Sequence, residues 1–139
     1  MSDNRTVVDL LKPADETGIA LAAPGRQSLT FSGLRAHVDR TVAALNRLGV
    51  GRNDPVAIVL PNGPEMASAF VSIAAGATTA PLNPAYKVDE FEFYLSDLGA
   101  KLLIVEAGSD SPARAAAEKL GTAIAELTPS SGPAGLFEL

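Results

Sequence analysis

Short apolar runs alternate with amphipathic stretches through the middle of this chain. The apolar run Pro55–Leu60 stops at Pro61–Pro64, where proline, asparagine and glycine indicate a turn. An amphipathic stretch then extends to Gly76, and a second apolar run follows at Thr78–Leu82. A strand, a turn, a helix and a strand within about 30 residues have the size of one βαβ unit. We therefore expect Pro55–Pro84 to be the unit around which the chain folds.

The same alternation continues through residue 127. The predicted helices are 64–76, 87–98 and 112–120, and the predicted strands are 55–60, 78–82, 101–105 and 122–127. The run 55–60 is continuously apolar, which indicates a strand covered on both faces, as in parallel sheets. With short loops between the elements, the pattern predicts an α/β fold: a doubly wound, mostly parallel sheet with helices on both faces, of the flavodoxin-like kind.

The part before this region is predicted to hold a β-hairpin and a helix. The hairpin joins 18–22 to 27–31 through Pro24-Gly25, and the helix begins at an N-cap Ser32 and ends before Gly49. A short helix or turn near the N-terminus would end at Pro13.

These predictions divide the chain into three parts. Residues 1–16 are an N-terminal extension, and residues 17–127 are the α/β subdomain. Residues 128–139 read TPSSGPAGLFEL, and their serine, proline and glycine indicate a linker or a truncated end.

Composition narrows the classes of function. With 139 residues, 47% of them hydrophobic and 19% charged, the chain can bury one core. The net charge of -5 without a basic stripe argues against nucleic acid as a partner. The lack of cysteine excludes disulfides and thiolate chemistry and fits a cytoplasmic protein. No apolar run approaches the ~20 residues of a membrane span.

Ligands of doubly wound sheets bind beyond the carboxyl ends of the strands, at a switch in strand order. The turns Pro61–Pro64 and Asn83–Tyr86 are the candidates. Asn62 and Asn83 each end a predicted strand, and we interpret them as turn formers first and as weak candidates for supporting a site second.

Other chemistry is not indicated. The pair Gly49-Val50-Gly51 follows a helix, which is the wrong side for a dinucleotide fingerprint, and no Walker loop is present. His37 is the sole histidine, so we predict a structural or surface role for it. The carboxylates near residues 89–97 are interpreted as solvated helix charges. We assign no catalytic, cofactor-binding or metal-binding residue.

An ordered set of motifs nevertheless resembles one family, the acyl-adenylate-forming enzymes. Leu29–Leu34 resembles their first core motif, with Phe31 in place of the commoner tyrosine. Gly49–Asn62 looks like the family pattern GVGxGDxVAIxLPN. The stretch 65–84 resembles the second core motif, and the similarity continues to residue 106 as in acyl-CoA synthetases.

The resemblance implies the N-terminal subdomain of an ATP-dependent carboxylate or fatty acid–CoA ligase. Such enzymes use ATP, Mg²⁺ and CoA to form an acyl-adenylate and then an acyl-CoA. Their phosphate loop, adenine and ribose motifs and catalytic lysine have no counterpart here, so we expect the chain to be inactive alone and to bind no cofactor. The remainder of the ligase would be its partner, and its exposed apolar surface would favour a homodimer.

Two alternatives stay open at the level of the sequence. One is a self-contained flavodoxin-like binding or signalling module, for which the tail would be dispensable. The other is a non-enzymatic interaction protein.

Overall fold

The computed structural model of the chain describes residues 6–12 and 15–139. The helices are α1 (Val7–Leu10), α2 (Phe31–Arg47), α3 (Pro64–Ala74), α4 (Val88–Leu98) and α5 (Pro112–Leu120). The strands are β1 (Ile19–Leu21), β2 (Leu29–Thr30), β3 (Pro55–Val59), β4 (Thr78–Pro81), β5 (Leu102–Glu106), β6 (Ala123–Pro129) and β7 (Phe137–Glu138). The predicted alternation of strands and helices is thereby confirmed.

The main sheet has the order β4-β3-β5-β6-β7. β4, β3, β5 and β6 pair in parallel, and β7 pairs antiparallel to β6. This is the mostly parallel, doubly wound sheet that the sequence predicts. The first four strands follow the order 2-1-3-4 of flavodoxin-like sheets. β1 and β2 form a separate antiparallel hairpin, also as predicted.

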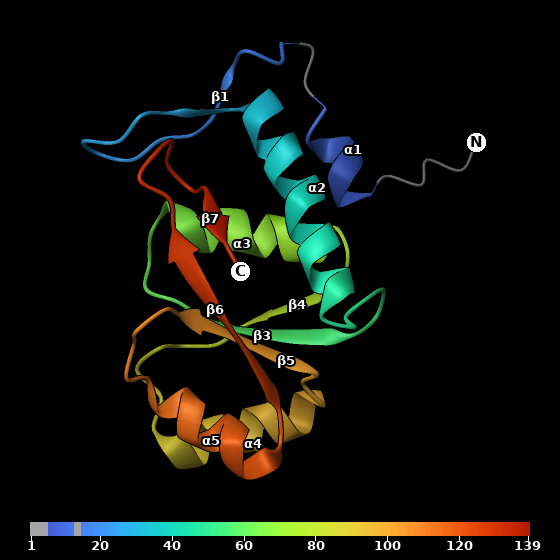
Figure 1. Cartoon of the computed structure of the whole chain (residues 1–139), viewed down its shortest axis with the longest axis vertical. Helices are drawn as coiled ribbons and strands as arrows, with labels where there is room; N and C mark the ends of the chain where they lie inside the picture. Colours follow the sequence, from blue (N-terminus) through green and yellow to red (C-terminus); the bar gives the residue numbers. More distant parts are fainter. Residues whose placement is uncertain (1–5, 13–14) are drawn as a thin grey trace.

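Helices cover both faces of the sheet, α2 and α3 on one and α4 and α5 on the other (Figure 1). Alternate residues of β3 and β5 point to opposite faces, as strand geometry requires. Val56 and Ile58 pack with Leu45 and Ile73 on the α2/α3 side. On the other side, a second cluster packs the strands against Phe91, Leu95 and the alanines of α5.

Local signals define most helix ends. Pro64 and Pro112 occupy the first helical positions of α3 and α5, and Gly99 and Gly121 end α4 and α5 in the left-handed conformation. The prediction for α2 is wrong by two residues. Its N-cap is Thr30, whose hydroxyl accepts a hydrogen bond from the backbone N–H of Gly33 at 3.1 Å, so Ser32 lies inside the helix.

The N-terminal end of the chain is described only in part. Thr6 caps α1 in a capping box with Asp9, and the helix ends at Leu10. The predicted helix end at Pro13 lies outside the described residues.

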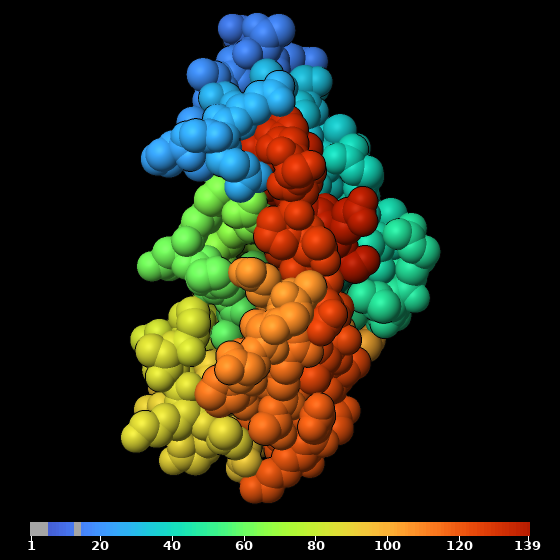
Figure 2. All heavy atoms as spheres, turned by 60° about the vertical axis from the view of Figure 1, so that its left-hand side comes forward, coloured from blue at the N-terminus to red at the C-terminus, as the bar shows by residue number. Residues whose placement is uncertain are grey.

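The interpretation of 128–139 as a linker does not match the structure. Residues 128 and 129 continue β6, and β7 pairs with them. Ala134 and Phe137 are buried, and Phe137 joins the core on the α2/α3 side. We call residues 130–139 the C-terminal strap. In Figure 2 this red segment runs between the blue hairpin and the helices of the α2/α3 layer.

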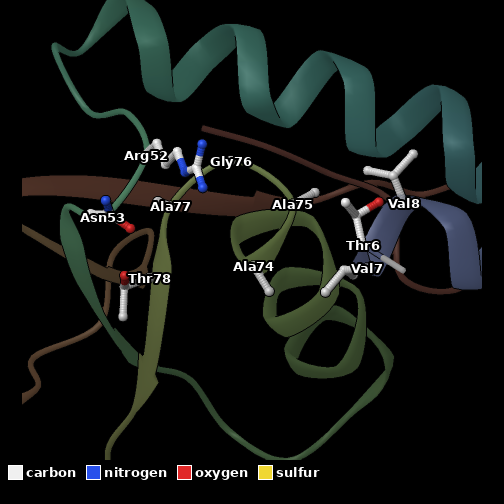
Figure 3. A pocket seen from close by; sticks show the side chains of 10 residues that line it. All are labelled: Thr6, Val7, Val8, Arg52, Asn53, Ala74, Ala75, Gly76, Ala77 and Thr78. Atoms are coloured by element: carbon white, nitrogen blue, oxygen red, sulfur yellow. The ribbon is translucent and has the colours of Figure 1, made fainter. Parts of the chain in front are cut away.

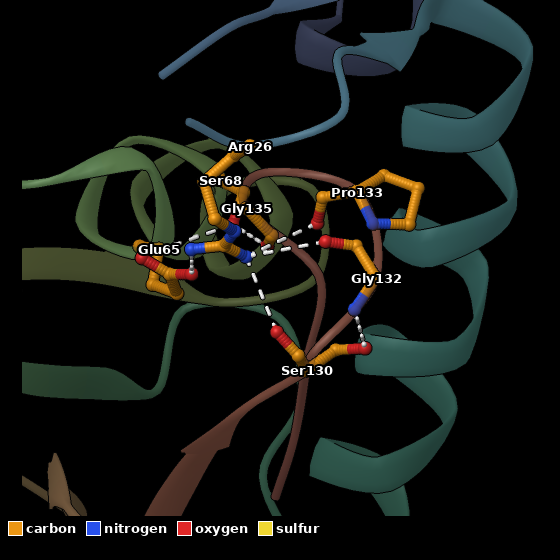
Figure 4. Close-up of polar contacts among 7 residues, drawn as sticks. All are labelled: Arg26, Glu65, Ser68, Ser130, Gly132, Pro133 and Gly135. Atoms are coloured by element: carbon orange, nitrogen blue, oxygen red, sulfur yellow. Dashed lines mark hydrogen bonds and ion pairs between the residues drawn. The ribbon is translucent and has the colours of Figure 1, made fainter. Parts of the chain in front are cut away.

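Side chains far away in the sequence hold the strap (Figure 4). The Arg26 guanidinium donates to the carbonyl oxygens of Ser130 at 3.2 Å and Pro133 at 3.4 Å, and it pairs with Glu65 at 2.9 Å. The Ser68 hydroxyl donates to the carbonyl of Gly135. Gly135 has a φ of 92°, and a Cβ there would lie 2.9 Å from the Leu21 side chain.

Candidate functional site

The switch in strand order lies between β3 and β5. The chain moves from β3 outward to β4 through α3, and then crosses back over β3 to β5 through α4. The crevice at the switch is therefore bordered by the loops that follow β3 and β5. The turn Pro61–Pro64 borders it, as predicted. The turn Asn83–Tyr86 follows the edge strand β4 instead, so its predicted place at the switch is corrected.

Asn62 and Asn83 nevertheless come together. Both line one pocket of about 620 Å³ at the carboxyl ends of β3 and β4. Its other lining residues are Leu60, Met66, Pro81, Leu82, Pro84 and Ala85. Because these residues are prolines, amides and aliphatic side chains, the pocket offers hydrogen-bonding groups without formal charge.

Asn83 acts as a turn former. Its Oδ1 accepts a hydrogen bond from the backbone N–H of Ala85 at 2.9 Å. Tyr86 ends the turn and stacks on Tyr94 with ring centroids 5.1 Å apart. The neighbouring Tyr94 hydroxyl raises the pKa of Tyr86 above its ordinary value. Asn62 is exposed between Pro61 and Gly63. Support of a bound group by either asparagine stays a prediction.

The loop after β5 borders the switch, although the sequence reading did not single it out. Gly108 has a φ of 75°, and the buried Oγ of Ser109 has no hydrogen-bond partner among the described residues. Arg114 of α5 donates to the carbonyl of Glu106 at 3.1 Å and pairs with Glu126 at 2.8 Å. Gly108 indicates a turn in the sequence, but the sequence alone does not show that this turn lies beside Pro61–Pro64.

His37 does not line the pocket of Asn62 and Asn83. It is 1% exposed on α2 and meets Phe137 of the strap edge-on, with ring centroids 4.3 Å apart. Burial, with a smaller effect of the nearby Arg40 charge, lowers its pKa from 6.5 to about 4. The imidazole is therefore neutral at pH 7 and packs as part of the core, which agrees with the predicted structural role.

A larger pocket of about 740 Å³ lies at the opposite end of the strands (Figure 3). It is bordered by α1, by Arg52 and Asn53 before β3, and by residues 74–78 after α3. Arg52 is its one charged side chain among the lining residues. Since the amino ends of parallel strands are not where α/β sheets bind ligands, we place the candidate site at the carboxyl ends.

No group of three or more His, Cys, Asp or Glu side chains in the described ranges is placed to hold a metal ion. No helix within residues 6–12 and 15–139 is long and apolar enough to cross a membrane.

The fold and the strand-end site define a flavodoxin-like α/β unit with an uncharged pocket beside the switch. Comparison with known proteins narrows this class. The family model of the AMP-binding enzymes matches residues 12–133. The chain therefore belongs to the AMP-binding enzyme family.

The relatives at the level of sequence include CoA ligases and peptide synthetases. The chain is 42% identical over 124 residues to the protein named probable CoA ligase CCL9 of Humulus lupulus, covering 86% of this chain and 24% of that protein. It is 42% identical over 103 residues to oxalate–CoA ligase of Arabidopsis thaliana, covering 73% and 20%. The chain thus spans between a fifth and a quarter of the length of these two relatives.

Solved structures share the fold. Apo MatB from Rhodopseudomonas palustris superimposes with a TM-score of 0.78 at 22% identity, over 91% of this chain and 26% of that one. The anthranilate CoA ligase AuaEII, solved with anthranoyl-AMP, superimposes with a TM-score of 0.76 at 26% identity, over 86% and 24%. The fold prediction is confirmed by these neighbours.

Proposed function

We propose that this chain is the N-terminal structural subdomain of an ATP-dependent carboxylate–CoA ligase. The whole enzyme would form an acyl-adenylate from a carboxylic acid and ATP, and would then transfer the acyl group to CoA. Membership of the AMP-binding family supports this proposal, as do the two CoA ligases that the chain resembles over a small share of their length. On its own, the chain would be inactive.

We base the proposed inactivity on the lack of free cationic side chains among the described residues of the pocket at the carboxyl ends of β3 and β4. Stabilising a triphosphate requires cationic groups and Mg²⁺ around the phosphates. The pocket at Asn62 and Asn83 has no charged lining residue, and Arg114 is already paired with Glu126. The residues at these strand ends therefore do not fit ATP or Mg²⁺, and we derive no step through either group. Nucleotide, metal ion and CoA would be held by other parts of the ligase.

The role left for the chain is that of a wall against which another part of the enzyme packs. From Pro61 to Tyr86 the sequence carries a single charged residue, Glu65, and Arg26 neutralises it at 2.9 Å. This stretch includes Phe70, which is 44% exposed. Surfaces with few charges and exposed aromatic residues are typical of buried interface centres. We propose the exposed part of this stretch, whose one carboxylate is paired, as the contact with the remainder of the ligase.

Pyrophosphate release tests the proposal. The isolated chain is incubated with ATP, Mg²⁺, CoA and a panel of short-chain, long-chain and aromatic carboxylates, with oxalate–CoA ligase of Arabidopsis thaliana as the positive control. We expect no carboxylate-dependent release from the isolated chain. Turnover that rises with chain concentration and needs a carboxylate would contradict the proposed inactivity.

The strand order also suits a second hypothesis, a flavodoxin-like binding module, because such modules share the order 2-1-3-4. Thermal unfolding with flavin mononucleotide, nucleotides and phosphate separates the two. A ligand that binds only the folded chain raises the unfolding temperature at concentrations above its Kd. We expect no shift with this panel, and a saturable shift would favour the module.

A further inference from the structure

A stripe of one exposed phenylalanine between two aspartates runs along the outer face of α4. Asp89, Phe93 and Asp97 are four residues apart and so lie on one face of the helix. Phe93 is 63% exposed, although Phe91, two residues earlier, is fully buried in the core. The Phe93 ring lies edge-on to Tyr94 at 5.3 Å, and Tyr94 stacks on Tyr86 at 5.1 Å. Phe93 is therefore an exposed ring that is held in place by its contact with Tyr94.

A groove between two helices contains this stripe. Leu120, at the end of α5, is 43% exposed and lines the same hollow of about 430 Å³ as Phe93. The complete lining is Asp89, Glu92, Phe93, Ser96, Asp97 and Leu120. α4 and α5 lie side by side at the end of the molecule away from the hairpin, α4 in yellow and α5 in orange in Figure 2. A groove between two neighbouring helices is the shape into which a third helix packs.

The charges around the groove are negative. Glu92 is neutralised by Lys119, whose Nζ lies 3.0 Å from its carboxylate. Asp89 and Asp97 are exposed and have no ion-pair partner among residues 6–12 and 15–139. They flank Phe93 at one helical turn on either side, about 12 Å apart along the axis for eight residues. The apolar centre thus lies between two exposed carboxylates.

We propose that this α4/α5 groove is a docking site for a cationic amphipathic helix of another polypeptide. The 11 residues of α4 match a partner helix of about three turns. Its apolar residues contact Phe93 and Leu120, and Lys or Arg residues seven or eight positions apart meet Asp89 and Asp97. Anionic lipid headgroups and nucleic-acid phosphates would be repelled by the same carboxylates. The groove uses no residue of the proposed ligase contact, so this inference does not depend on the proposed function.

A pair of designed peptides tests the docking site. Both are helices of about 14 residues with leucines on one face, and the other face carries lysines in one peptide and glutamates in its match. We expect saturable binding of the leucine–lysine peptide by fluorescence anisotropy, weakened several-fold at about 0.5 M salt, and no binding of the leucine–glutamate peptide. Equal binding of the two peptides, or no binding of either, would overturn the proposal.

Variants of the chain locate the binding. Phe93→Ser should weaken binding of the leucine–lysine peptide about tenfold, as loss of an interface anchor does, and D89K with D97K should weaken it further. Phe70→Ser removes an exposed phenylalanine from the opposite helical layer and should leave the affinity unchanged. An equal loss in Phe70→Ser would show non-specific adsorption and refute the site.

Two other occupants are distinguished in the same samples. Light scattering of the chain alone reports self-association. A dimer that Phe93→Ser abolishes would assign the groove to a second copy and would overturn the proposal. Sedimentation with vesicles rich in phosphatidylserine should leave the chain in the supernatant, and binding that Phe93→Ser removes would assign the groove to a membrane surface.

Discussion

The two helical layers of this domain are held to the same sheet by different means. The α4/α5 layer packs on the strands mainly through Phe91, Leu95 and the alanines of α5, with Arg114 bonded to Glu106 and Glu126 at the strand ends. Among residues 6–12 and 15–139, the four polar residues that are buried as a whole are His37, Thr41, Ser68 and Ser72, and all belong to α2 and α3. The hairpin and the C-terminal strap also lie on that side.

Both layers bury apolar side chains against the sheet, but the α2/α3 layer adds buried polar residues and polar contacts with distant segments. Apolar burial is non-directional and scales with area. Polar contacts are directional, and they are costly when one partner is removed and the other stays buried. The α4/α5 layer should therefore respond to lost volume, and the α2/α3 layer should respond to lost charges and to pH.

The largest effect is expected from Phe91→Ala. Phe91 is fully buried between α4 and the sheet, and removing such a ring costs about 3–5 kcal/mol of unfolding free energy. Phe93→Ala on the same helix is the matched control, since an exposed ring changes stability by about 0.5 kcal/mol or less. Urea denaturation measures both. Similar losses for the two variants would contradict apolar burial as the cause.

The next effect is a loss of stability in acid through His37. Its pKa is about 4 in the folded chain and near 6.5 when unfolded, so the unfolded chain takes up the proton first. The free energy of unfolding should fall as the pH drops from 6.5 to 4, by roughly 3 kcal/mol at most. Urea denaturation at several pH values across this range should show that the free energy of unfolding falls less steeply with pH in His37→Gln than in the unaltered chain. An unchanged slope would contradict a buried neutral imidazole.

Arg26→Gln should cost about 2 kcal/mol, because Glu65 and the strap carbonyls lose their charged donor. The loss should be local. The N–H of Ala134 donates a hydrogen bond to the backbone carbonyl of Gln27 at 2.8 Å. Amide hydrogen exchange should therefore become faster at Ala134 and should stay slow in β5. Arg35→Gln breaks the Arg35–Glu16 pair, in which Glu16 is 55% exposed, and should cost less than about 1 kcal/mol. Unchanged exchange at Ala134 in Arg26→Gln would disprove the role of Arg26.

The smallest effect should come from Lys119→Gln. Lys119 is 68% exposed in its pair with Glu92, so the pair contributes about 0.5 kcal/mol or less. Thermal or urea unfolding should barely change. A loss as large as that of Arg26→Gln would mean that even exposed ion pairs hold the α4/α5 layer strongly, and the contrast between the layers would disappear.

Local sequence signals account for most of the fold. Continuous apolar runs identified β3 and β5, and Pro112 with Gly121 bounded α5 because these residues act within their own turn. The prediction of a linker at the strap was wrong because the strap is held by residues that are distant in the sequence. Its Ser, Pro and Gly residues resemble a linker, yet it is fixed by Arg26, 104 positions before Ser130, and by Ser68, 67 positions before Gly135. Contacts of that separation leave no local pattern.

The candidate site likewise has one part that local sequence signals predict and one part that they do not. Asn62 and Asn83 were found because each follows an apolar run. Their common pocket, and the neighbouring loop with Ser109, depend on strand order. Strand order is set by how the helices cross the sheet, which the alternation of elements does not specify.

The central claim is that the chain supplies a structural wall and no reactive group. A chimera tests it most directly: the 103 residues of this chain that match oxalate–CoA ligase of Arabidopsis thaliana, at 42% identity, replace their counterparts in that enzyme. We predict that the folded chimera releases pyrophosphate in a carboxylate-dependent reaction, whereas the isolated chain does not. A chimera that folds but forms no adenylate, or an isolated chain that turns over, would contradict the account.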